Sequence, residues 1–230
     1  MKLAAVLLAR TIGFVETFDL SPRGKVFYPD LANELVQRYR FQKFPQELSD
    51  FDEQKGIEFL YGKAGEEVVE RVQIFTNGIL VDTRSNTSTS QAILEEALVW
   101  AAERFGLSYR PGMIKRYAYI SQVSFHSNTP LNALSPALQR LADRLTSAVS
   151  EIHGERIEYQ TAAVMVQHDP LKRKVPIAGF TIFPRAETPF SERKFFSEAP
   201  IPTDLHLELL KDFEAEIQKG LGKSNPNLKS

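Results

Sequence analysis

Apolar residues recur at helical spacing in four segments of the chain. In these segments the hydrophobic positions fall three or four residues apart, which places them on one side of a helix. The segments are residues 29–39, 88–105, 135–153 and 203–218. In the third segment, Ser135 before Pro136 is a typical helix start and Gly154 a typical helix end. We expect the apolar side of this helix to be buried; it consists of Leu138, Leu141, Leu145, Val149 and Ile152.

Shorter apolar runs between the helices predict strands. These runs are residues 3–18, 57–61, 68–75, 79–81, 116–125, 157–167 and 175–183. Asn77-Gly78 separates two of them and indicates a hairpin, because a type I′ turn needs positive φ at both central residues. A polar tract, Asp82 to Gln91, follows this hairpin, and Ser88 and Gln91 within it have the spacing of a capping box at a helix start.

Two hairpins, one at Asn77-Gly78 and one that joins residues 157–167 to 175–183, together with four helices predict an α+β fold. Hairpins require antiparallel pairing, and the helices have to cover a face of the sheet. We therefore expect a two-layer sandwich of mostly antiparallel sheet covered by about four helices. No linker or change in composition divides the chain, so residues 1–218 are predicted to form a single α+β domain, followed by a polar C-terminal tail at residues 219–230.

The composition is typical of a globular cytoplasmic protein. Hydrophobic residues make up 43% and charged residues 25% of the 230 residues, which is far from the range of disordered chains. The absence of cysteine excludes disulfides and thiolate chemistry and favours a reducing compartment. The opening segment resembles a signal peptide, but its apolar run of seven residues before Arg10 is short and continues as a strand would. No stretch approaches the roughly 18 apolar residues of a membrane span, so we expect no membrane partner.

Four residues are candidates for binding a phosphate-bearing ligand. His126 and His168 each follow an apolar strand, and two imidazoles can divide proton donation and acceptance near neutral pH. Neither has a hydroxyl residue two positions on, which argues against a catalytic pairing. Arg84 and Ser85 lie before a helix start, where free backbone N–H groups and the helix dipole favour an anion. The tract around them has no glycine, and turn and capping roles are the favoured alternative.

The chain has no recognisable catalytic or metal-binding motif. His-x-x-x-His spacing and a Gly-x-Ser-x-Gly sequence are both absent from the sequence. We therefore predict no metal ion and no cofactor, and an enzyme is less expected than a binding protein. A basic run, Lys172, Arg173 and Lys174, lies at a predicted hairpin tip and makes nucleic-acid binding an alternative, although the net charge of −1 gives no attractive field for the whole molecule.

Phenylalanines in two irregular segments are candidates for binding a protein partner. They are Phe41, Phe44, Phe51, Phe190, Phe195 and Phe196. Residues 77–85 and 97–101 resemble segments of bacterial proteins of no assigned activity, and this resemblance implies no function. The leading hypothesis is a non-enzymatic protein-binding or assembly subunit of a bacterial multi-protein or homo-oligomeric complex. The alternatives are an enzyme or ligand-binding module for phosphate-bearing small molecules or nucleotides, and a nucleic-acid-binding protein.

Overall fold

The computed structural model describes residues 1–21, 28–172 and 177–224. Within these residues, eight strands form a sheet in the order β2-β3-β4-β1-β5-β8-β7-β6. The strands are β1 (Lys2–Gly13), β2 (Ile57–Ala64), β3 (Glu67–Phe75), β4 (Gly78–Thr83), β5 (Tyr117–His126), β6 (Val164–Val166), β7 (Phe180–Pro184) and β8 (Lys194–Ala199). The helices are α1 (Thr17–Leu20), α2 (Tyr28–Tyr39), α3 (Thr87–Phe105), α4 (Pro136–His153) and α5 (Thr203–Ser224). The predicted α+β class, with helices on a mostly antiparallel sheet, is confirmed.

Contacts divide the chain into two compact units. The N-terminal unit consists of residues 6–122 with 199–204, and the C-terminal unit consists of residues 1–5, 123–198 and the described part of 205–230. Strands β1 and β5 therefore contribute residues to both units. The single domain expected from the sequence stays a prediction.

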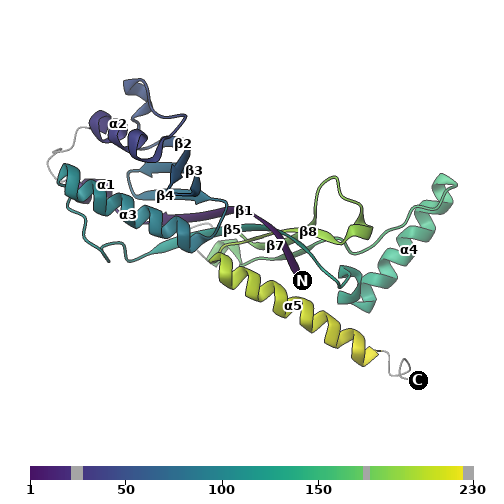
Figure 1. Cartoon of the computed structure of the whole chain (residues 1–230). Helices are drawn as coiled ribbons and strands as arrows, with labels where there is room; N and C mark the ends of the chain where they lie inside the picture. Colours follow the sequence, from purple (N-terminus) through teal and green to yellow (C-terminus); the bar gives the residue numbers. More distant parts are fainter. Residues whose placement is uncertain (22–27, 173–176, 225–230) are drawn as a thin grey trace. The chain divides into compact units, whose positions relative to one another are not determined.

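In the N-terminal unit, α2 and α3 pack on one face of the strands. Phe59, Val72 and Val81 are paired across β2, β3 and β4, so their side chains share this face. There they join Leu35 of α2 and Leu94 of α3 in one buried cluster. Figure 1 shows α2 beside β2 and α3 beside β4. The two-residue period of the strands and the helical period of α2 and α3 thus meet in one core.

A small apolar cavity remains between these helices and the sheet. Its volume is about 70 Å³, and its lining includes Leu35, Val81, Ala97 and Ala101. The Oγ atom of Ser21, which also belongs to the lining, is buried and has no hydrogen-bond partner in the described part of the chain. The helices and the sheet therefore do not fill the space between them completely.

The predicted hairpin at Asn77-Gly78 is confirmed, but its turn differs from the expectation. Phe75 pairs with Gly78, so the turn consists of Thr76 and Asn77, and Gly78 is the first residue of β4. Neither Asn77 nor Gly78 has a positive φ, so the type I′ geometry is wrong. A Cβ at position 78 would lie 3.1 Å from the carbonyl oxygen of Gly13 in β1, so glycine allows the two strands to approach closely at this point.

In the C-terminal unit, α5 packs against β7 and β8 (Figure 1). Ile182 and Phe195 of the strands are buried together with Leu210 and Ile217 of the helix. The helix continues to Ser224, past residue 218, where the sequence predicts that it ends. Residues 225–230 of the predicted tail lie outside the described residues.

Two strands of this unit are shorter than predicted. The apolar run at residues 157–167 forms a strand only at Val164–Val166. The N–H groups of Ile157 and Tyr159 donate instead to the hydroxyls of Ser150 and Thr146 on α4, at 2.9 and 2.8 Å. Because helix side chains bind these N–H groups, they are not available to a neighbouring strand. The other shortened strand, β7, begins at residue 180, and residues 173–176 before it lie outside the described part.

Candidate protein-binding surface

Helix α4 begins and ends with the residues that the sequence predicts. The Oγ atom of Ser135 accepts a hydrogen bond of 3.3 Å from the backbone N–H of Ala137, and Pro136 occupies the first turn. At the other end, Gly154 has φ of 72°, in the left-handed region, and its N–H donates to the carbonyl oxygen of Ser150. These caps define a helix of 18 residues.

Four of the five residues predicted to form the buried side of α4 are exposed and Val149 is half-buried, so the prediction of a buried side is wrong. Leu141 exposes 54% and Ile152 exposes 77% of its surface, and Leu138 and Leu145 expose 43% and 42%. Of the residues on this helix, Ala142 is the one that is buried. The prediction failed because helical spacing identifies an apolar side without showing what covers it. We call Leu138, Leu141, Leu145 and Ile152 the α4 stripe.

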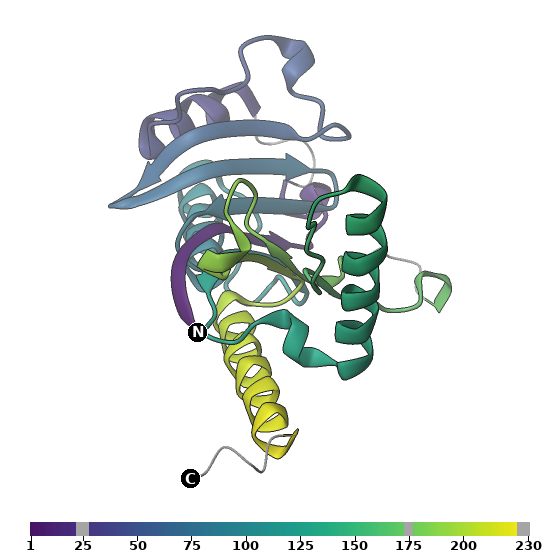
Figure 2. The same ribbon diagram turned by 90° about the vertical axis from the view of Figure 1, so that its right-hand side faces the viewer.

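The side of α4 that faces its own unit carries small and polar residues, with Ala142 buried and Val149 half-buried beside the hydroxyls of Thr146 and Ser150. Beyond Gly154 the chain runs back along the helix (Figure 2), and this returning segment bonds to the hydroxyls of Thr146 and Ser150. Helices on the surface of globular proteins ordinarily have the reverse arrangement, with the apolar side inward. Within its unit, α4 therefore leaves its four large apolar residues Leu138, Leu141, Leu145 and Ile152 to the solvent.

A cleft of about 580 Å³ lies next to the polar side of α4. Its lining includes Asp143 of α4, Arg156 beyond the helix, and Phe190 and Arg193 of the segment before β8. Arg193 has φ of 48°, which is uncommon for a residue other than glycine, and its guanidinium donates to the carbonyl oxygen of Asn128 at 2.8 Å. The cleft combines charges of both signs with an aromatic rim.

Most of the large exposed apolar side chains belong to the C-terminal unit. Outside the α4 stripe, they include Tyr159, Met165, Val166, Leu171, Ile177, Phe183, Phe190, Leu205 and Leu209. Single exposed apolar residues are common on protein surfaces, whereas contiguous sets mark interaction sites. The α4 stripe is such a set, because its members follow one another along one side of a helix.

The six phenylalanines predicted to bind a partner differ in exposure. Phe41 is 4% exposed and its ring lies 5.6 Å from that of Phe59, so it is part of the core of the N-terminal unit. Phe44 and Phe51 pack against the same core. Phe195 is buried and Phe196 is partly buried, whereas Phe190 is 51% exposed. Of this set, Phe190 is therefore the residue that presents a large part of its ring to the solvent.

The polar tract before α3 forms a helix cap. Asn86 is the N-cap residue, and its side-chain oxygen accepts a hydrogen bond of 2.9 Å from the N–H of Ser88. The N–H of Thr87 donates to the hydroxyl of Thr203 at 3.2 Å. The helix begins at Thr87, two residues before the expected position, so the predicted capping box of Ser88 and Gln91 is wrong.

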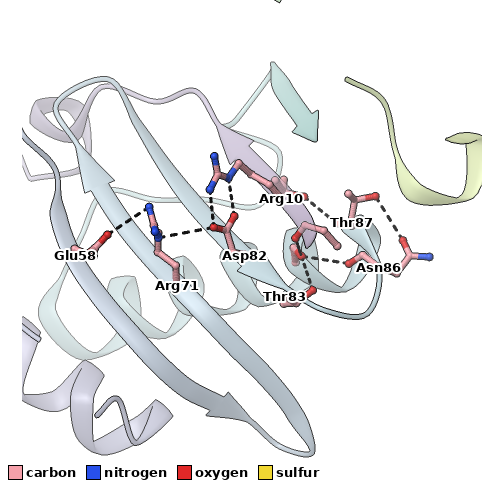
Figure 3. Close-up of polar contacts among 10 residues, drawn as sticks. Arg10, Glu58, Arg71, Asp82, Thr83, Asn86 and Thr87 are labelled. Carbon is pink, nitrogen blue, oxygen red and sulfur yellow. Dashed lines mark hydrogen bonds and ion pairs between the residues drawn. The ribbon is translucent and has the colours of Figure 1, made fainter. Parts of the chain in front are cut away.

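Further hydroxyl groups form hydrogen bonds at the start of α3. The Oγ1 atom of Thr83 lies 2.9 Å from the Oγ atom of Ser90, and the hydroxyl of Thr11 donates to the carbonyl oxygen of Thr87 (Figure 3). Because the first N–H groups of α3 already have protein acceptors, these contacts favour capping over anion binding.

The four predicted ligand-binding residues are divided between the two units. In the N-terminal unit, Arg84 pairs with Glu70 at 2.9 Å, and Ser85 lies 3.3 Å from the hydroxyl of Thr83. His126 and His168 belong to the C-terminal unit. Their convergence with Arg84 on one ligand stays a prediction.

Both of these histidines contact backbone carbonyl groups. The Nδ1 atom of His126 lies 3.4 Å from the carbonyl oxygen of Glu192. The two ring nitrogens of His168 lie 3.1 Å from the carbonyl oxygens of Asp169 and Ile177, which connects the two ends of one loop. Among the described residues, no three His, Asp or Glu side chains are grouped as metal ligands.

The basic run proposed to bind nucleic acid is described at one position. Lys172 is exposed, and its Nζ atom lies 3.9 Å from a carboxylate oxygen of Asp169. Arg173 and Lys174 lie outside the described residues. Nucleic-acid binding at this run stays a prediction.

A row of charges crosses four strands of the N-terminal unit (Figure 3). Arg10 on β1 donates two hydrogen bonds to Asp82 on β4, at 2.7 and 2.8 Å. Arg71 on β3 lies 3.9 Å from Asp82 and 3.4 Å from Glu58 on β2. The row depends on the register of β1, β3 and β4, which the spacing of residues in the sequence does not reveal. Alternation along β4 places Asp82 on the sheet face opposite to α3.

The C-terminal unit contains a buried Ser–His contact that the sequence pattern also does not reveal. The hydroxyl of Ser197 donates to the carbonyl oxygen of Thr181 at 2.7 Å, and its Oγ atom lies 2.8 Å from Nε2 of His206. Because the hydroxyl has one proton, the imidazole Nε2–H is the donor in the second contact. This direction is the reverse of a catalytic pair, in which histidine accepts the proton. Burial lowers the pKa of His206 to about 4.

No protein-family model matches the chain, and no curated protein matches its sequence. None of the helices in the described residues combines the length and the hydrophobicity that crossing a membrane requires.

Proposed function

We propose that the chain is a non-enzymatic protein-binding or assembly subunit and that the α4 stripe is part of its binding surface. The observation that carries this proposal is the orientation of α4, whose Thr146 and Ser150 hydroxyls bond to its own unit while four large apolar side chains remain exposed. Full burial of one such side chain is favourable by about 1.5–3 kcal/mol, so a partner that covers the α4 stripe gains a substantial part of its binding free energy there.

The polar contacts of the chain support a binding role over a catalytic one. The hydroxyl of Ser197 donates to a carbonyl group, and the ring nitrogens of His168 contact loop carbonyls. Arg84 is held by Glu70. A reducing, cytoplasmic location is part of the same proposal and is supported by the absence of cysteine.

Photo-cross-linking tests the binding surface. A photoreactive amino acid is placed at Leu145 on the α4 stripe or, as a control, at Ser147. Ser147 is also exposed, and it lies about 200° around the helix axis from Leu145. In irradiated cells that express the chain, we expect protein adducts from position 145 and few from position 147. Equal yields at the two positions, or no adduct at position 145, would overturn the proposal.

A second candidate function is binding of a small anionic ligand in the cleft beside α4. The observation that favours it is the size of the cleft, which lies within the range of small-molecule sites, together with Arg156, Arg193 and Lys194 in its lining. We expect inorganic phosphate or a nucleotide to raise the melting temperature of the chain. The increase should be absent in an Arg193→Gln variant, and a ligand effect that this variant retains would exclude the cleft.

A further inference from the structure

The α4 stripe continues as a regular heptad seam. Leu138, Leu141, Leu145, Ala148 and Ile152 are separated by three, four, three and four residues, and all five are exposed. This alternation is the a/d pattern with which one helix packs against a similar helix, knobs into holes. The seam from position 138 to position 152 is about 21 Å long. A second helix of the same length and pattern would cover it.

Two opposite charges lie on one flank of this seam. Arg144 and Glu151 are seven residues apart, which is close to two full turns, so both face the same way around the helix. Both side chains are exposed, and neither makes an ion pair within residues 1–21, 28–172 and 177–224. Arg140 precedes Arg144 by one turn, so the first half of the flank is positive and the second half is negative.

From these observations we infer that the partner of the α4 stripe is α4 of a second copy of the chain, packed antiparallel across a two-fold axis. This inference rests on the proposed function and names the partner. An antiparallel copy places Arg144 beside Glu151 of the other copy twice, once on each side of the axis, as a self-complementary interface requires. In a parallel pair the two Arg144 side chains would lie at the same level on opposite sides of the axis, about 10 Å along the helix from Glu151, so neither opposite charge would be paired.

The charges also fix where the axis crosses the helix. Arg144 and Glu151 are equidistant from the point between Ser147 and Ala148, so the axis lies there. Measured along the helix axis, Ala148 is then about 2 Å from Ala148 of the other copy, whereas Ala137 is about 30 Å from Ala137 of the other copy. The two alanines are eleven residues apart and thus lie on nearly the same side of the helix, and both are exposed.

Cysteine cross-linking tests this arrangement directly, because the chain has no cysteine of its own. We compare full-length Ala148→Cys and Ala137→Cys variants under oxidation and with a short bismaleimide. The inference predicts covalent dimers from position 148 and none above background from position 137. Efficient dimers from both positions would indicate a parallel pair, and no dimer from either would exclude pairing through α4. Both results overturn the inference.

Charge exchange provides the second test. In Arg144→Glu, two negative side chains face each other across the interface, and in Glu151→Arg two positive ones do. Each variant alone should self-associate about tenfold more weakly than the wild type in sedimentation experiments. An equimolar mixture of the two variants restores both attractive pairs and should recover association. A mixture no better than the separate variants would contradict the inference.

The photo-cross-link at Leu145 separates this inference from the proposed function. Adducts of twice the mass of the chain support both the protein-binding role and the second copy as partner. Adducts with other proteins, without any self-adduct, overturn the second copy as partner and leave the protein-binding role intact. The absence of all adducts overturns both.

Discussion

The Nε2–H group of His206 donates to the Oγ atom of Ser197, 2.8 Å away, in the interior of the C-terminal unit. This contact connects α5 to β8, and the hydroxyl of Ser197 extends it to Thr181 of β7. Since His206 has no exposed surface, its imidazole is held in the neutral form by burial. The stability of the unit therefore depends on the protonation of this ring.

We expect the free energy of unfolding to fall as the pH decreases from about 6.5 to about 4. The unfolded chain protonates His206 near pH 6.5, whereas the folded chain resists protonation until its lowered pKa of about 4. Between these values the unfolded state binds more protons, so the loss reaches about 3 kcal/mol at the acidic end. Urea unfolding at a series of pH values measures it. A His206→Gln variant should show a flatter dependence over this range, and an unchanged slope would exclude His206 as the cause.

An Asp82→Ala substitution should destabilise the chain by about 2 kcal/mol. The carboxylate of Asp82 is nearly buried and accepts both hydrogen bonds from Arg10, which is itself mostly buried. The matched control is Arg84→Ala, which removes an ion pair to Glu70 whose arginine is 66% exposed, and its cost should be below about 0.5 kcal/mol. Equal losses in denaturant unfolding would contradict the assigned role of the charge row.

Replacing Asn86 by alanine should cost about 1 kcal/mol, because it removes the acceptor for the N–H of Ser88 at the start of α3. The neighbouring Ser88→Ala substitution leaves this backbone bond intact and should change stability by less than about 0.5 kcal/mol. Thermal unfolding of the two variants compares them. If Ser88→Ala proved the more costly, the cap would be assigned to the wrong residue.

An Ala97→Met substitution should stabilise the chain by about 1 kcal/mol, since the new side chain fills the cavity between α3 and the sheet. Methionine suits this position because it is flexible and forms helices well. Ala92→Met, at an exposed position of the same helix, should have little effect on the melting temperature. A decrease in stability for Ala97→Met would show that the surrounding side chains cannot accommodate the added volume.

Local patterns in the sequence correctly predicted the fold class and most of the helix ends. Ser135 and Gly154 mark the ends of α4, and Gly106 ends α3 in the left-handed region, because capping depends on residues near in sequence. The hairpin after Phe75 was found for the same reason. Its predicted turn geometry was wrong, because Gly78 belongs to β4 and lies close to Gly13 of β1, a contact between residues far apart in the sequence.

The candidate surface could be predicted only in part. Helical spacing identified the apolar residues of α4, yet their exposure depends on the returning segment, whose N–H groups bond to Thr146 and Ser150. Aromatic content suggested Phe41 as a surface residue, but packing against Phe59 places it in the core. Contacts such as Arg10–Asp82 and Ser197–His206 depend on strand register and helix packing, which composition and spacing do not reveal.

Strands β1 and β5 belong partly to each compact unit, and residues 199–204 return to the N-terminal unit, where Thr203 and Thr87 bond to each other through backbone N–H and hydroxyl groups. No single cut of the polypeptide releases either unit whole. Truncated fragments ending near residue 122 would lack this returning segment and the last residues of β5, so their misfolding would be mistaken for loss of a binding site. Point substitutions in the full-length chain are therefore the appropriate means of dissecting its activities.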